Sequence, residues 1–125
     1  DVYKRQTARR QMNPEPQPPN SVVITNVHDS KGTMLRVVRL TDDGGLMIEG
    51  HDLGGGVEQF FGAYEYEFEK QFSSDAVARL RDLLGLESDD ELLPTIKNRF
   101  TYTDDLEEFL RDNGIEGKFW SRVGD

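Results

Sequence analysis

Three glutamates recur at every second position of the sequence, at Glu65, Glu67 and Glu69. In an extended strand, side chains two residues apart point to the same face and stand about 7 Å apart. This spacing is too wide for one small cation unless other residues add ligands, but it suits a row of Lys or Arg side chains from a protein partner. An ordinary solvated face is the more common explanation of such a pattern, because charges on exposed strands also prevent edge pairing.

Each of the two histidines in the chain is followed by an aspartate: His28 by Asp29, and His51 by Asp52. Neighbouring residues of a strand point to opposite faces, so neither pair forms a chelate by itself, and we expect no zinc or iron site. A small hydrolase or metal-dependent enzyme centred on His51, Asp52 and Glu58 is an alternative, because a further carboxylate would complete an acid–base group.

Three consecutive glycines, Gly54, Gly55 and Gly56, form a candidate anion-binding or loop site. Backbone amides of a glycine-rich turn bind phosphate when a Lys and a Ser or Thr follow at phosphate-loop spacing. Neither residue type follows at that spacing here, and the carboxylates of Asp52 and Glu58 would repel an anion. The glycines are therefore predicted to form a corner or bulge of a strand.

The charge of the chain limits its partners. The 125 residues include 15 basic and 24 acidic side chains, and the part after residue 19 carries 11 basic and 22 acidic ones. So acidic a surface repels nucleic-acid phosphate and anionic lipid, whereas it attracts a basic protein. The chain has no cysteine, and its mean hydropathy is −0.68. We therefore expect a cytoplasmic protein without cofactor or membrane span.

The first twenty residues differ from the rest of the chain. They contain four of the five prolines and show no apolar periodicity, so we predict a disordered tail over residues 1–20 and a single domain over residues 21–125. The first six residues, DVYKRQ, resemble the translation of an adapter used in sequencing libraries, and they are left out of the fold prediction.

Runs of β-branched and alternating residues predict a series of strands. They lie at residues 22–27, 34–40, 46–50, 63–72 and 118–123. Asp43, Gly44 and Gly45 predict a tight turn between the second and third strands, so an antiparallel meander is expected. The face opposite the glutamates is aromatic and is predicted to lie beneath helices; it carries Tyr64, Tyr66, Phe68 and Phe72.

Apolar residues at helical spacing predict three helices between the last two strands. The expected boundaries are Ser73 or Ser74 to Gly85, Ser88 to Phe100, and Thr103 to Asn113. Gly85 and the Asn113–Gly114 pair are the expected stops of the first and third helices. Pro94 lies beyond the first turn of a helix that starts after Ser88, so it either kinks this helix or marks its real start. Helices grouped after strands predict an α+β fold, with an antiparallel sheet of about four to five strands and about three helices packed on one face.

The remaining aromatic residues are predicted to be buried, and one of them has a second interpretation. Phe60, Phe61 and Trp120 are predicted to lie in the core, because aromatic side chains contribute a large buried area. Trp120 has a second interpretation, because tryptophan close to arginine is favoured at protein interfaces.

Two segments, VVRLTDDGGLMIEGHDLGGGVEQFFGAYEYEFE and LEEFLRDNGIEGKFWSR, resemble a group of small acidic bacterial proteins. The shared pattern is D-L-G-x-G-V-E-x-F-F-G, followed by E-Y-E and a terminal F-W-S-R, and the resemblance covers residues 34–125. It implies no particular activity. In size and charge, rather than in any motif, the chain is also similar to immunity proteins that neutralise toxins.

These observations predict a non-catalytic, immunity-like binding module. It would present Glu65, Glu67 and Glu69, with Trp120 as a further contact, to a basic protein partner. Two alternatives are the enzyme centred on His51, Asp52 and Glu58, and a structural or regulatory homodimer that pairs through an edge strand.

Overall fold

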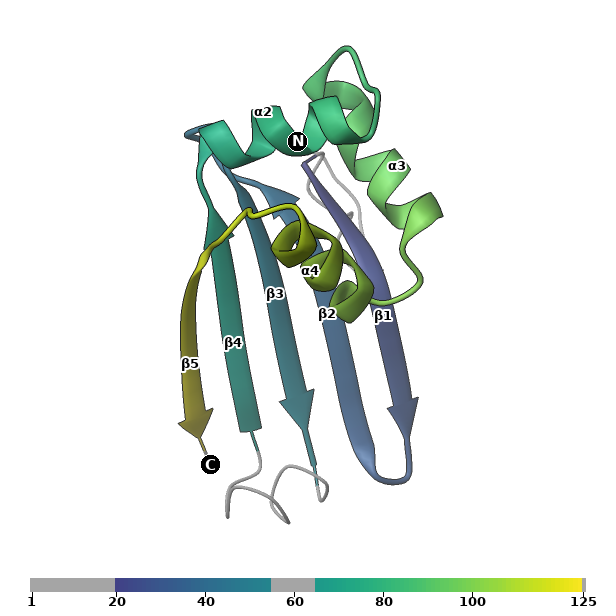
Figure 1. Cartoon of the computed structure of the whole chain (residues 1–125). Coiled ribbons are helices and arrows are strands. Elements are labelled where there is room, and N and C mark those ends of the chain that lie inside the picture. Colours follow the sequence, from purple (N-terminus) through teal and green to yellow (C-terminus); the bar gives the residue numbers. More distant parts are fainter. Residues whose placement is uncertain (1–19, 55–64, 125) are drawn as a thin grey trace, which may run out of the picture.

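A computed structural model describes residues 20–54 and 65–124, and it contains one five-stranded sheet with helices on one side (Figure 1). The strands are β1 (Ser21–Asp29), β2 (Gly32–Leu40), β3 (Leu46–Leu53), β4 (Glu65–Phe72) and β5 (Lys118–Gly124). Their order in the sheet is their order in the chain, and each neighbouring pair is antiparallel. The predicted antiparallel sheet is therefore confirmed.

The helices all lie between β4 and β5 in the chain. They are α2 (Ser74–Leu83), the short 3-10 helix η1 (Asp89–Glu91), α3 (Leu92–Arg99) and α4 (Thr103–Asp112). The hydroxyl of Ser73 accepts a hydrogen bond from the amide of Ala76, which satisfies a free donor at the start of α2. Gly85 and Gly114 adopt positive φ after α2 and α4, as the sequence predicts for helix stops.

The second predicted helix begins later than its apparent cap. The Ser88 side chain bonds to the Glu91 side chain instead of capping a helix, and α3 starts at Leu92 after the 3-10 turn. Pro94 consequently lies in the first turn of α3, where its missing N–H is not required. Of the two sequence interpretations, the structure has the one in which Pro94 marks the start.

The side of the sheet that carries the helices, called the helix face below, contains the core. Val38, Ile48 and Phe72 are buried on it against apolar residues of the helices. The full set of buried core residues is Val38, Leu46, Ile48, Phe72, Ala76, Val77, Leu80, Leu92, Leu93, Ile96, Phe100, Leu106, Leu110 and Ile115. The strands, however, extend beyond the helices toward the turn between β1 and β2 (Figure 1).

On the part of the helix face beyond the helices, side chains of the strands pack against one another. The ring of Phe68 occupies the space above Gly50, where a Cβ would lie only 2.0 Å from the ring. The guanidinium of Arg36 lies 4.9 Å from the centroid of that ring and forms two hydrogen bonds with the Asp52 carboxylate, of 2.7 and 3.2 Å. Gly50 thus allows a close cross-strand contact that any side chain would block.

The alternation predicted for β4 is confirmed over the residues that the structure describes. Phe72 is buried on the helix face, Phe68 packs against the core, and Tyr66 is half-buried. Tyr64, Phe60 and Phe61 lie outside the described residues. The three glutamates of β4 occupy the opposite side of the sheet, which we call the open face.

None of the helices within residues 20–54 and 65–124 is long and apolar enough to cross a membrane.

Candidate functional site on the open face

The register of the strands aligns the side chains of the open face in rows. One row, called the Trp120 row below, consists of Val23, Val37, Glu49, Glu69 and Trp120. The next, called the Arg122 row, consists of Asn26, Leu35, His51, Glu67 and Arg122. Because residues two apart on a strand share a face, these rows lie side by side. The glutamates of β4 therefore have a different cross-strand neighbour at each position.

The two rows border a hollow of about 230 Å³. It is lined by Leu35, Val37, Glu49, Gly50, His51, Glu67, Phe68, Glu69 and Trp120. Leu35 and Val37 contribute apolar surface, while the carboxylates of Glu49 and Glu69 add negative charge. The hollow is open to solvent and combines apolar, aromatic and anionic walls.

Glu49 and Glu69 are direct partners across β3 and β4, so two like charges face each other. Burial raises the pKa of Glu49, the positive charge of Arg39 opposes this rise, and the negative charge of Glu69 adds to it. Arg39 forms an ion pair with Glu49. Among the residues that the structure describes, Glu69 forms no ion pair; its carboxylate accepts one hydrogen bond of 3.4 Å from the Gln71 amide. Within residues 20–54 and 65–124, Glu69 therefore has no compensating cation.

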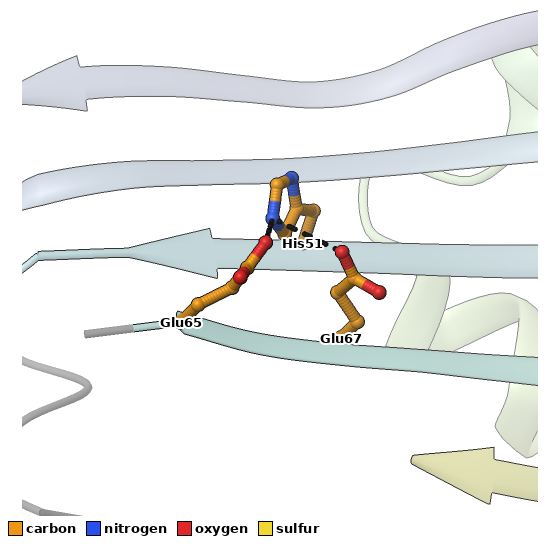
Figure 2. Close-up of side chains that lie close together, drawn as sticks. All are labelled: His51, Glu65 and Glu67. Carbon is orange, nitrogen blue, oxygen red and sulfur yellow. Dashed lines mark hydrogen bonds and ion pairs between the residues drawn. The ribbon is translucent and has the colours of Figure 1, made fainter. Parts of the chain in front are cut away.

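His51 joins two of the β4 glutamates, as Figure 2 shows. Its Nε2 atom lies 2.6 Å from Oε2 of Glu65 and 3.5 Å from Oε2 of Glu67. The hydrogen bond from His51 is the main cause that holds the pKa of Glu65 below its ordinary value, although desolvation opposes it. An ionised Glu65 is an acceptor only, so Nε2 of His51 is the donor of this bond.

Arg122 contacts the same two carboxylates from β5. Its guanidinium lies 3.0 Å from Oε1 of Glu67 and 3.9 Å from Oε1 of Glu65. Arg122 thus faces one oxygen of each carboxylate, and His51 faces the other. The row of glutamates is consequently less negative than its sequence suggests, because a basic residue lies beside two of its three members.

The His51 and Asp52 pair proposed for catalysis is separated by the sheet. His51 lies on the open face with Glu65, whereas Asp52 lies on the helix face and binds Arg36. This follows from strand alternation and corrects the alternative in which both side chains enter one catalytic site. Glu58, its third member, lies outside the described residues.

Gly54 is the only member of the triple glycine within the described residues. It has a φ of 110°, and a Cβ on it would lie 2.7 Å from the Cα of Gly32, the first residue of β2. This close approach favours the strand-corner interpretation over an anion site. Gly55 and Gly56 lie outside the described residues, so the prediction for them is untested.

Trp120 is 47% exposed on β5, so the prediction of a core location for it is wrong. β5 is an edge strand, and Trp120 pairs with Glu69 of the open face, whereas the helices lie on the other side of the sheet (Figure 1). Its exposure fits the second interpretation, a contact residue, because an exposed indole beside carboxylates has apolar surface free for a ligand.

No protein-family model, curated protein or solved structure matches the chain. The assignment of a function therefore depends on the geometry of the open face.

The sequence-based reasoning missed several members of this face. It singled out Glu65, Glu67 and Glu69 but not Glu49, and it left out four further residues, Leu35, Val37, Arg39 and Arg122. Alternation in the hairpin of β2 and β3, whose turn was predicted, would have placed Glu49 on the same face as His51. The pairing with β5 had no such local signal, because three helices separate β5 from β4.

Proposed function

We propose that the protein is a non-catalytic binding module that holds a Lys or Arg side chain of a protein partner in the hollow of the open face. The observation that carries this proposal is the opposition of Glu49 and Glu69, with no cation from the described residues at Glu69 and with Trp120 next in the row. Like charges directly across a strand pair destabilise a sheet. A cation placed between the two carboxylates attracts both of them, so the local electrostatic interaction becomes favourable.

The walls of the hollow suit both the charged group and the methylene groups of a long cationic side chain. The indole of Trp120 offers an aromatic face to an ammonium or guanidinium group, and such contacts are strongest with tryptophan. Leu35 and Val37 provide apolar surface along which the methylene groups of Lys or Arg can lie. The volume of about 230 Å³ is below the roughly 300–1,000 Å³ of typical small-molecule pockets, which favours one side chain over a whole ligand.

The charge of the whole chain supports the same kind of partner. A net charge of −9 accelerates the approach of a basic protein and makes the association sensitive to salt. Neutralisation of a basic toxin, as in the immunity proteins that the chain resembles in size and charge, is one form of this function.

The test is selection from a library of short peptides, followed by titration of single peptides at low salt with the fluorescence of Trp120, the only tryptophan, as the signal. Selected peptides should contain Arg or Lys at a constant position, and replacement of that Arg by uncharged citrulline should abolish binding. Added salt should weaken binding. Equal affinity for the arginine and citrulline peptides would refute the proposal.

Matched variants locate the interaction on the protein. Glu69→Gln should weaken peptide binding by about tenfold or more, as expected for a central contact. Glu87→Gln removes the same charge from an exposed position far along the chain and should leave affinity nearly unchanged. Equal losses in both variants would mean that only net charge matters. Light scattering separates the homodimer alternative, because pairing of two β5 strands would double the mass of the free protein.

A further inference from the structure

The open face gathers one imidazole and two carboxylates beside the hollow. His51 comes from β3, and Glu65 and Glu67 come from β4 (Figure 2). One nitrogen and two oxygens from these side chains all lie within 4.8 Å of one another. Among the residues that the structure describes, this is the only place where three such ligand atoms converge. We infer that His51, Glu65 and Glu67 form a binding site for a divalent transition-metal ion of the zinc type.

The distances approach those of a coordinated ion. With metal–ligand bonds of about 2.0–2.2 Å in a tetrahedral arrangement, ligand atoms lie about 3.4 Å apart. Nε2 of His51 is already 3.5 Å from Oε2 of Glu67. Its hydrogen bond of 2.6 Å to Oε2 of Glu65 must open by less than 1 Å, as the metal replaces the shared proton. Rotation of side chains supplies this movement without a change in the strands.

Arg122 orients the two carboxylates for this role. It contacts the Oε1 atoms of Glu65 and Glu67, and the Oε2 atoms are the ones that face His51. Groups that hold the outer oxygen of a ligating carboxylate, as Arg122 does here, are a regular part of protein metal sites. The Arg122 side chain comes from the neighbouring strand on the side away from His51, so it does not occupy the space between the ligand atoms.

The donor set selects the class of ion. An imidazole with two carboxylates suits Zn²⁺, Co²⁺ and related ions, whereas Ca²⁺ and Mg²⁺ prefer oxygen ligands alone. The side chains of His51, Glu65 and Glu67 are 36%, 26% and 30% exposed, so water reaches the site. Three protein ligands leave a further coordination position, which water fills. The site therefore differs from a closed structural zinc site, and its loss need not unfold the protein.

The experiment is titration of the full-length protein, without a histidine tag, with Co²⁺ and Zn²⁺. Calorimetry should give one Zn²⁺ per chain, and Co²⁺ should produce visible absorption and quench the fluorescence of Trp120. His51→Gln should abolish both signals, whereas His28→Gln, which changes the only other histidine, should leave them unchanged. Absence of Zn²⁺ and Co²⁺ binding, or equal losses in the two histidine variants, would overturn the inference.

Variants of β4 separate this site from the proposed peptide site. Glu65→Gln and Glu67→Gln should weaken metal binding by about tenfold or more, as is common for the loss of one ligand or its support. Glu69→Gln, on the same strand and face, should leave metal affinity intact while it weakens peptide binding. Circular dichroism and urea unfolding should show that each variant is folded. Metal binding that is lost in Glu69→Gln but kept in Glu65→Gln would contradict the assigned ligands.

Discussion

The two faces of the sheet are built by the same strands but differ in the arrangement of their charged side chains. On the helix face, Lys70 of β4 lies 3.6 Å from Glu107 of α4, and Arg36 binds Asp52. One residue earlier on β4, Glu69 faces Glu49 on the open face. Among the described residues, both faces contain ion pairs, but the directly opposed like charges of Glu49 and Glu69 lie on the open face. We infer that the helix face maintains the fold and that the open face is shaped for a ligand.

The largest expected change in stability comes from removing apolar side-chain volume on each face. Ile48→Ala, at a fully buried position of the helix face, should lower the free energy of unfolding by about 2–5 kcal/mol. Leu35→Ala, at a half-buried position of the open face, should lower it by about 1 kcal/mol. Urea unfolding of both variants measures the difference. Equal losses would mean that the open face is part of the core.

The second test compares one ion pair from each face. Asp52→Asn should lower the free energy of unfolding by about 1–3 kcal/mol, because the Arg36 guanidinium is largely buried and would lose a charged partner. Glu67→Gln should cost at most about 1 kcal/mol, because Arg122 is half exposed and solvent replaces its partner. Thermal and urea unfolding would measure both. A larger loss from Glu67→Gln would reverse the assignment of the two faces.

The smallest effect has opposite signs on the two faces. Glu69→Gln should raise the free energy of unfolding by about 0.2–1 kcal/mol, because it removes the like charge opposite Glu49. Glu107→Gln should lower it by up to about 1 kcal/mol, because it leaves Lys70 without its partner. Chemical unfolding at neutral pH measures both changes. A loss of stability in Glu69→Gln would show that its charge stabilises the free protein.

The same pair predicts a pH dependence. Because the pKa of Glu49 is raised in the folded protein, the native state binds more protons than the unfolded state just above the ordinary value of 4.5. This contribution to stability therefore falls as pH rises from 4.5 through the raised pKa. Glu69→Gln removes one cause of the rise, so the decline should become smaller. The measurement is the free energy of unfolding of both proteins at a series of pH values. An equal decline in Glu69→Gln and the unchanged protein would mean that the two carboxylates do not interact.

The alternation of residues along β4 was sufficient to predict its two faces, because the period of a strand has only two possible phases. The cluster of His51 with Glu65 and Glu67 was not predictable in the same way. A shift of two residues between β3 and β4 preserves every side chain on its face but places His51 opposite a different glutamate. Residues 54–64 separate the two strands in the sequence, and a connection of this length does not fix the register as a two-residue hairpin loop does.

The exposure of Trp120 illustrates a second limit. Its apolar type favours burial, and nothing near it in the sequence shows that β5 would lie at the edge of the sheet. The order of the strands and the side chosen by the helices decide its exposure, and both are long-range properties of the fold. Local signals, by contrast, were enough for the Ser73 cap and the stops at Gly85 and Gly114.

The last strand has a consequence for both proposed ligands. In the part of the chain that the structure describes, β5 pairs with β4 alone, yet it contributes Trp120 to one row and Arg122 to the next. A peripheral strand detaches from a sheet at a lower free-energy cost than global unfolding requires. Fraying of β5 would therefore remove a wall from both proposed binding surfaces at once. A bound peptide should therefore slow amide hydrogen exchange across residues 118–124, because it opposes the local opening of β5.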